Sequence, residues 1–169
     1  KVVRTNHFAY GLVPPEEGKL DFLRSRDKFP NSAGVRRIAG NSGYGFGGLQ
    51  LVEKAERGEI DVFVLVYPHS LVKSPNGDAL LARLEAALSK VQTSVVIDYL
   101  QSPVSDAANI LIPGLAHAEK IGTMDNSIGM TQKLGPSILP SPDRIPEHDI
   151  FLELSAAVVE KQQEPTVSS

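Results

Sequence analysis

Three short apolar segments constrain the fold of this chain more than any other feature. "DVFVLVY" (residues 61–67), "TSVVIDY" (93–99) and "NILIP" (109–113) are rich in valine and isoleucine. Continuous rather than alternating hydrophobicity is typical of strands buried on both faces, as in parallel sheets. We therefore predict central strands at 61–67, 93–99 and 109–112. The core residues expected from them are Val64, Leu65, Val66, Val95, Val96 and Ile97.

A helical pattern separates the first two segments. In "DALLARLEAALSK" (78–90), Asp78 is a candidate N-cap. Apolar residues recur at helical spacing, and Leu84 and Leu88 should pack on the sheet. Strand, helix, strand, short turn and strand is the order of a parallel α/β sheet. We expect a doubly wound, Rossmann-like sheet, and three strands are so few that it should be an incomplete part of a larger fold.

The rest of the chain divides into three expected regions. Residues 1–45 are expected to be an irregular linker or arm, because "GLVPPEEGK" and the glycine cluster offer few apolar contacts; a short helix within it should end at Phe29-Pro30-Asn31. Residues 46–160 form the α/β domain. It should begin with a helix over 49–57 that Gly58 ends, and close with a helix over 147–160 carrying Phe151, Leu154 and Val158 on one face. Residues 161–169 are expected to be a disordered tail.

Composition excludes several classes of function. The 169 residues are enough for one ordinary domain, and a net charge of −3 without a basic run gives no footprint for nucleic acid. No apolar run approaches the ~20 residues of a membrane span. The absence of cysteine removes thiolate metal sites, iron–sulfur ligation and cysteine nucleophiles. The chain begins with Lys1 rather than methionine, and we expect it to be a fragment of a longer protein.

A glycine-rich segment invites a nucleotide-binding interpretation. Residues 43–48, "GYGFGG", match G-x-G-x-x-G before a helix. A dinucleotide site also needs a strand directly before this loop, and "GVRRIAGNS" is a poor strand. Asp61 opens a strand instead of ending one. A mobile glycine loop is therefore favoured over a dinucleotide site. Ser42 misses the G-x-S-x-G nucleophile motif because Tyr44 takes the last position.

The histidines are scattered through the chain. They are His7, His69, His117 and His148. Only His117 has a near acidic neighbour, Glu119, and that pair lacks a third ligand. Surface or capping histidines are therefore favoured over a metal site.

Acidic residues also have ordinary interpretations. Asp98 ends a predicted strand, at the edge where α/β sheets usually bind ligands. A residue that caps a backbone N–H at the start of a loop is the preferred interpretation. Glu53, Glu56 and Glu59 indicate a solvated helix face.

The segment "ANILIPGLAHAEKIGTMDNSIGMTQ" (108–132) resembles a pattern of the molybdopterin oxidoreductase family. In that family a strand ends in Leu-Pro and a polar loop follows. "EKAERGEIDVFVLVYPHSL" and "PSPDRIPEHDIFLELSAAV" resemble flanking parts of the same unit. "DFLRSRDKFPNSAG" resembles the branch formed by the large peripheral-arm subunit of bacterial NADH:quinone oxidoreductase (complex I). The resemblance covers about residues 21–160. The matching loop residues are Glu119, Lys120, Gly122, Thr123, Asn126, Gly129 and Gln132.

Several positions depart from the family pattern. Tyr67-Pro68-His69 stands where pterin-binding relatives often carry Gly-x-Asn-Pro, and Met130 replaces an arginine suited to phosphate. The loop is therefore expected to persist as structure, with Gly122 and Gly129 permitting tight turns and Thr123 and Asn126 satisfying backbone groups. The remaining departures are Asn109 for aspartate, and Ile121 and Met124 for polar or aromatic residues.

The resemblance implies a non-catalytic structural domain of that large subunit, which supports electron transfer from NADH to quinone. Its expected partners are other parts of the same subunit and other peripheral-arm subunits of complex I, in the cytoplasm and peripheral to the inner membrane, without direct membrane insertion. No catalytic, cofactor-binding or metal-binding residues are expected in this chain; iron–sulfur clusters are expected elsewhere in the full subunit. The alternatives are a molybdopterin-dinucleotide-binding domain of a formate-dehydrogenase-like oxidoreductase, and a nucleotide-binding module using the 43–48 loop.

Overall fold

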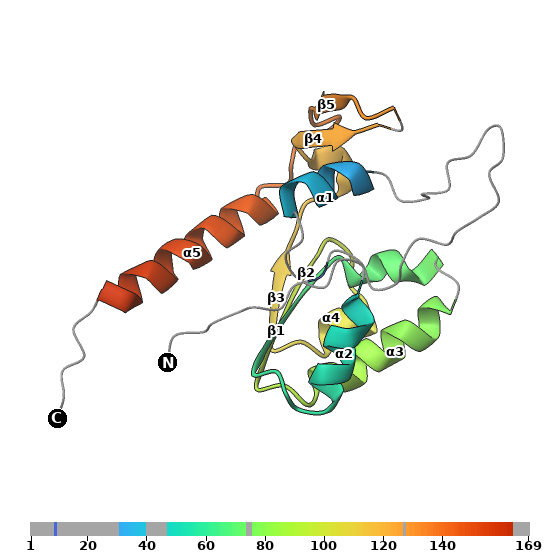
Figure 1. Cartoon of the computed structure of the whole chain (residues 1–169), viewed down its shortest axis with the longest axis vertical. Coiled ribbons are helices and arrows are strands. Elements are labelled where there is room, and N and C mark those ends of the chain that lie inside the picture. Colours follow the sequence, from blue (N-terminus) through green and yellow to red (C-terminus); the bar gives the residue numbers. More distant parts are fainter. Residues whose placement is uncertain (1–8, 10–30, 40–46, 74–75, 127, 164–169) are drawn as a thin grey trace.

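A computed structural model describes residue 9 and residues 31–39, 47–73, 76–126 and 128–163 (Figure 1). Its centre is a parallel sheet of β1 (Val62–Val66), β2 (Thr93–Asp98) and β3 (Ile110–Pro113), in the order β1-β2-β3. The α/β class, the parallel pairing and the three strands are confirmed. Each strand boundary lies within one residue of its predicted position.

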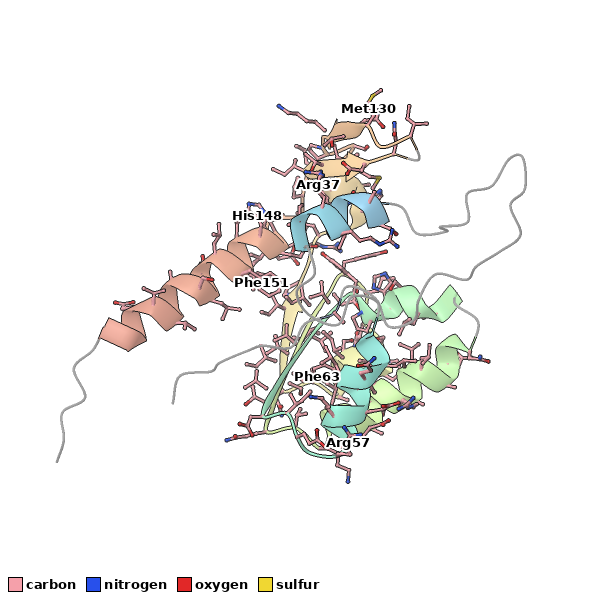
Figure 2. The ribbon with its side chains drawn as sticks, in the orientation of Figure 1. Arg37, Arg57, Phe63, Met130, His148 and Phe151 are labelled. Carbon is pink, nitrogen blue, oxygen red and sulfur yellow. The ribbon has the colours of Figure 1, made fainter. Side chains whose placement is uncertain are left out.

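Three helices cover one face of this sheet. They are α2 (Gly48–Glu56), α3 (Gly77–Leu88) and α4 (Pro103–Asp106), and Figure 1 shows them together on the same side. The core beneath them includes Val52, Leu84 and Val96, each at most 1% exposed. Phe63 of β1 points into this layer, next to α2 (Figure 2). The predicted packing of α3 on the sheet is confirmed, because Leu84 and Leu88 are both buried.

Helix boundaries follow local backbone chemistry. Gly58 follows α2 with φ of 71°, the left-handed conformation typical of a helix end. The predicted N-cap Asp78 is wrong: it lies in the first turn of α3, and the residue before the helix is Asn76, with φ of 59°. Gly77 starts the helix because it packs on the backbone carbonyl of Leu71, in η1 (Pro68–Lys73), leaving no room for a side chain.

The other face of the sheet is largely open. Val64 and Val66 are 37% and 43% exposed, so their assignment to the core is wrong. Leu65 and Val95 are half-buried, and only Val96 and Ile97 are fully buried as expected. The reason is topological. The strand order runs in one direction, and both crossovers place their helices on one face; a sheet is wound on both faces only where the order reverses.

Helix α5 (Glu147–Gln163) lies on the open side of the sheet. Ile150 in its first turn is buried, and the helix then runs away from the body of the molecule (Figure 1). The helix predicted over 147–160 is confirmed. Its apolar face remains uncovered, since Phe151, Leu154 and Val158 are all exposed. Residues 161–163, expected in the tail, continue this helix, whereas 164–169 lie outside the described residues.

A small layer sits at the carboxyl end of the strands. It consists of α1 (Ser32–Ala39) and the antiparallel hairpin β4 (Gly122–Asp125) and β5 (Thr131–Leu134). The prediction of an irregular arm therefore does not hold over 32–39, and most of 1–30 lies outside the described residues. The segment predicted as a polar loop after β3 contains η2 (His117–Glu119) and this hairpin. The strands β4 and β5 are mostly exposed and lack the alternation of apolar and polar residues from which a strand is predicted.

Candidate functional site

The carboxyl ends of β1 and β2 carry a cluster of three rings. Tyr67 follows β1, Tyr99 follows β2 and His69 lies in η1. The ring centroids of His69 and Tyr99 are 4.3 Å apart, and those of Tyr67 and Tyr99 are 5.9 Å apart. Because ligands of open α/β sheets usually bind beyond the carboxyl ends of strands, this cluster is the candidate site.

Asp98 and His69 form the polar centre of the cluster. Asp98 is the last residue of β2, and its buried carboxylate accepts hydrogen bonds from the backbone N–H of Tyr99 at 2.8 Å and of His69 at 3.2 Å. The capping role preferred for Asp98 is confirmed. Nδ1 of His69 also donates to this carboxylate. A surface position for His69 is wrong, because its side chain is only 14% exposed.

An imidazole oriented by a carboxylate is half of a nucleophilic triad. The other half is a hydroxyl or thiol in hydrogen-bond reach of the free ring nitrogen. Among the described residues, the side chain of His69 makes a hydrogen bond only to Asp98, and its ring meets Tyr99 edge-on. The pair therefore acts as a clamp that joins the segment after β1 to the end of β2.

A second polar group closes the same edge. The hydroxyl of Tyr67 donates to a carboxylate oxygen of Glu147 and also lies 3.1 Å from the carbonyl oxygen of Leu115. Nζ of Lys120 is 2.5 Å from the same Glu147 oxygen and 3.7 Å from the centroid of the Tyr67 ring. This group links the end of β1, the segment after β3 and the first turn of α5.

Charges in this second group are matched. Burial raises the pKa of Tyr67 well above its ordinary value, and the hydrogen bond to Glu147 raises it further, so the phenol remains a donor. Burial alone would raise the pKa of Glu147, but hydrogen bonds from Lys120 and Tyr67 bring it below the ordinary value. Tyr67 adopts φ of 55°, which is uncommon for a bulky residue and is held here by these bonds.

Glu119, one of the residues that match the family loop, has a structural role in this fold. Its buried carboxylate accepts from the backbone N–H of Ala116 at 2.6 Å and of Ser141 at 3.1 Å, and from Nη1 of Arg144 at 3.0 Å. The Ala116 bond is the main reason that its pKa is lowered. His117 is exposed, and no three potential ligands in the described part of the chain are grouped to hold a metal.

Asn126 performs the structural role that was expected. Its Oδ1 accepts from the backbone N–H of Ile128 at 3.1 Å and of Met130 at 2.9 Å, and Gly129 permits the turn with φ of 80°. Thr123 does not behave as expected: it is exposed in β4, and its side chain makes no hydrogen bond to the residues that the structure describes.

Two other residues that match the family loop are part of the strands of the hairpin. Gly122 begins β4 instead of forming a turn, and Gln132 belongs to β5, opposite Met124. Ile121 and Met130 are exposed at the hairpin.

Asp125 makes a contact that the sequence did not reveal. Its carboxylate accepts from Thr131 Oγ1 at 2.6 Å and from Arg37 Nη2 at 3.1 Å. Its backbone N–H donates to Asn31 Oδ1 at 2.9 Å. Arg37 reaches from α1 toward the hairpin (Figure 2). Only the folded chain brings these residues together, because 88 positions separate Arg37 from Asp125.

Asn109, where the family resemblance expects an aspartate, supplies a hydrogen-bond acceptor just before β3. Its Oδ1 accepts from the backbone N–H of Ser94 at 2.8 Å and from the Ser94 hydroxyl at 2.9 Å. The backbone N–H of Asn109 donates back to that hydroxyl at 3.0 Å. An amide satisfies this site as well as a carboxylate would, so the departure costs β3 no pairing.

The remaining candidate residues lie away from this edge or serve the surface. Glu56 pairs with Arg83 and Glu59 with Arg57, and Glu53 is exposed, as predicted for a solvated helix face. His148 is exposed beside Asp149. His7 and Ser42 lie outside the described residues.

The context required for a dinucleotide loop is not met. Only Gly47 and Gly48 of the 43–48 motif are among the described residues. The nearest described residues before the motif, 32–39, form helix α1, whereas a dinucleotide site requires a strand that leads into the loop.

The edge does not fit a pterin dinucleotide. Every buried side-chain nitrogen or oxygen of the described residues has a hydrogen-bond partner within the chain. Glu119 and Asn126, which the family resemblance places in the loop, are engaged with backbone N–H groups. Tyr67 packs so closely on Gly114 that an added methyl group there would lie 2.9 Å from its hydroxyl. Within the described part of the chain, a diphosphate would find no unpaired buried side-chain donor.

Two curated relatives indicate the ancestry of the chain. The alpha subunit of NADPH-Fe(3+) oxidoreductase from Geobacter sulfurreducens is 29% identical over 105 residues, covering 62% of this chain and 12% of the relative. The G subunit of NADH-quinone oxidoreductase from Yersinia pestis is 28% identical over 127 residues, covering 73% and 13%. The chain is distantly related to oxidoreductase subunits.

These similarities cover a small part of the relatives. The chain spans about an eighth of the length of either one. No protein-family model matches the chain. No helix among the described residues is long and apolar enough to cross a membrane.

Proposed function

We propose that this chain is a non-catalytic structural domain of a large oxidoreductase subunit of the kind found in the peripheral arm of complex I. In that role it supports electron transfer from NADH to quinone structurally, without carrying a redox centre itself. The observation that carries the proposal is that the acidic side chains at the carboxyl ends of the strands already have partners within the chain. Asp98 accepts hydrogen bonds from the His69 ring and from two backbone N–H groups, and Glu147 is paired with Lys120 and Tyr67.

The loop after β3 supports the same conclusion. Glu119, Asn126 and Asp125 each stabilise local backbone or a neighbouring element. Glu119 and Asn126, which the resemblance places in the loop that reaches toward the pterin in cofactor-bearing relatives, thus hold the fold together here. We propose that the chain carries no catalytic, metal or cofactor-binding residues, and that iron–sulfur clusters belong to other parts of the full subunit. Its partners are those other parts and further peripheral-arm subunits, on the cytoplasmic side of the membrane.

The first test separates structure from catalysis in the oxidoreductase of the native host. His69→Gln and Leu84→Ala are introduced into the chromosomal gene. We expect Leu84→Ala to lower the amount of assembled complex, while both variants keep NADH:quinone activity per assembled complex within twofold of wild type. A tenfold loss per assembled complex in His69→Gln, with normal assembly, would contradict the structural role.

The second test concerns ligands directly. Protein from the native host is analysed for molybdenum, tungsten and iron bound to this domain, and the chain is titrated with molybdopterin guanine dinucleotide and with NADH. We expect no stoichiometric metal and no micromolar binding. Binding that Thr123→Ala or Gly45→Ala abolishes would instead favour the pterin-dependent or nucleotide-binding alternative.

A further inference from the structure

The uncovered face of the sheet is a continuous aliphatic surface. The pairing register places Val64, Val95 and Ile110 in one row across the three strands, and Val66, Ile97 and Ile112 in the next. Val64, Val66 and Ile110 are 37%, 43% and 48% exposed. We call this surface the open face; it consists of Val62, Val64, Val66, Thr93, Val95, Ile110 and Ile112.

Helix α5 continues this surface on a second side. Ile97, Leu115 and Ile150 are buried where α5 leaves the sheet, and they are not part of the core cluster beneath α2 and α3. Leu154 and Val158 follow Ile150 at spacings of four residues, so they share its side of the helix, and both are exposed. Phe151 lies on the side of α5 nearer the sheet (Figure 2). These buried residues therefore lie between two exposed apolar surfaces, the open face of the sheet and one side of α5.

The composition of the open face indicates a domain interior. Six of its seven residues are valine or isoleucine, the seventh is Thr93, and none is charged. Surfaces for separate partner proteins are enriched in aromatic residues, methionine and arginine, whereas an uncharged β-branched surface is typical of a sheet packed on a helix within one fold. The single direction of the strand order also leaves this face without a crossover helix.

Two other occupants fit less well. A second copy cannot lay its own flat sheet on the open face, because α5 projects from the same side (Figure 1). Closure of α5 itself would cover the face but would pull its first turn away from the Tyr67, Lys120 and Glu147 contacts. Helices elsewhere in the same polypeptide are the remaining source, and each relative is about eight times as long as the part of it that this chain matches.

We propose that the open face and the facing side of α5 hold a helix of the same polypeptide from outside residues 1–169. The side of that helix in contact is aliphatic and uncharged, because a charge buried against six valine and isoleucine side chains would have no partner. This inference rests on the proposed function, since it requires the chain to be a domain of a larger subunit.

The test is site-specific photo-crosslinking in the full-length protein of the native host. The photoreactive residue p-benzoylphenylalanine replaces Val64, and in a matched control it replaces Glu85, an exposed residue of α3. Crosslinked peptides are identified by mass spectrometry of protein made from mixed heavy and light isotopes. We expect Val64 to crosslink in high yield to one helical segment of the same polypeptide outside 1–169, with an uncharged apolar side, and Glu85 not to reach that segment. Ile110 serves as a second position if the Val64 variant does not accumulate.

Other outcomes overturn the inference in distinguishable ways. A crosslink to residues 147–163 means that α5 closes the face, a crosslink to any other part of residues 1–169 means that another segment of this chain does, and a mixed heavy–light crosslink means that a second copy does. A crosslink to a different protein means an external partner. A Val64 yield no higher than that of Glu85 means that the face remains in water. Activity and assembly of the oxidoreductase are measured on the same preparations, so a correct crosslink in a protein without NADH:quinone activity would remove the proposed function and leave the occupant of this face established.

Discussion

The ring of His69 donates through Nδ1 to the buried carboxylate of Asp98, across 29 positions of sequence. The same carboxylate also accepts a hydrogen bond from the backbone N–H of His69, so Asp98 fixes both the backbone and the ring of that residue. This contact lies at the edge where α/β sheets usually bind ligands, and it connects the segment after β1 to the end of β2.

Removing the imidazole should therefore weaken the fold. His69→Ala leaves the buried Asp98 carboxylate with fewer donors, and we expect a loss of about 1–3 kcal/mol in the free energy of unfolding. Urea denaturation followed by circular dichroism measures it. The matched control is His117→Ala, an exposed histidine, for which a change within about 0.5 kcal/mol is expected. Equal stabilities of the two variants would contradict the clamp.

Leu84 tests the core between α3 and the sheet. Its side chain is 1% exposed, so Leu84→Ala removes buried methyl groups and leaves a cavity. We expect a cost of about 2–5 kcal/mol in the free energy of unfolding. Leu152→Ala in α5 is the matched control, because Leu152 is 65% exposed and should change stability by no more than about 0.5 kcal/mol. A cost below about 1 kcal/mol at Leu84 would be inconsistent with this packing.

Gly77 tests the close approach between η1 and α3. An added Cβ would overlap the backbone carbonyl oxygen of Leu71, and backbone cannot move aside as a flexible side chain can. Gly77→Ala should therefore cost about 1–3 kcal/mol, although alanine is the better helix former. Thermal unfolding compares it with Gly135→Ala, where the added methyl group meets nothing within 4 Å. A stabilised Gly77→Ala variant would show that the two segments do not pack in this way.

Asp125 should make the hairpin sensitive to acid. The hydroxyl of Thr131, followed by the guanidinium of Arg37, lowers the pKa of Asp125 against the opposing effect of burial. A pKa lowered in the folded state means that the unfolded chain binds the proton more readily. The stabilisation is complete above the ordinary value of about 3.9 and is lost as pH falls through the lower folded value.

The measurement compares melting temperatures between pH 6 and pH 2. Thr131→Val removes the main cause of the shift, so the variant should lose less stability than wild type on acidification below about pH 4. Hydrogen exchange of α1, which Arg37 ties to Asp125, should show the same difference. Thr123→Val, an exposed change in the same hairpin, should leave the wild-type pH profile intact. Parallel profiles for wild type and Thr131→Val would exclude the contribution of Asp125.

The sequence alone determined the elements that depend on local patterns. Continuous runs of valine and isoleucine located all three parallel strands, and the spacing of Leu84 and Leu88 placed the helix that packs on them. The hairpin of β4 and β5 escaped prediction because its residues are exposed and carry no alternating apolar face. Local periodicity reports burial, so elements with little burial leave little signal.

Tertiary structure decided everything that depends on which distant segments meet. An apolar run cannot say which side of a strand is covered; the order β1-β2-β3 decided that Val96 is buried and Val64 is open. No spacing rule joins His69 to Asp98 or Arg37 to Asp125, because each pair meets only when separate elements are placed side by side. Composition and pattern thus specified the three parallel strands and the helices α2, α3 and α5, while strand order and long-range pairing closed one edge of the sheet and left one face open.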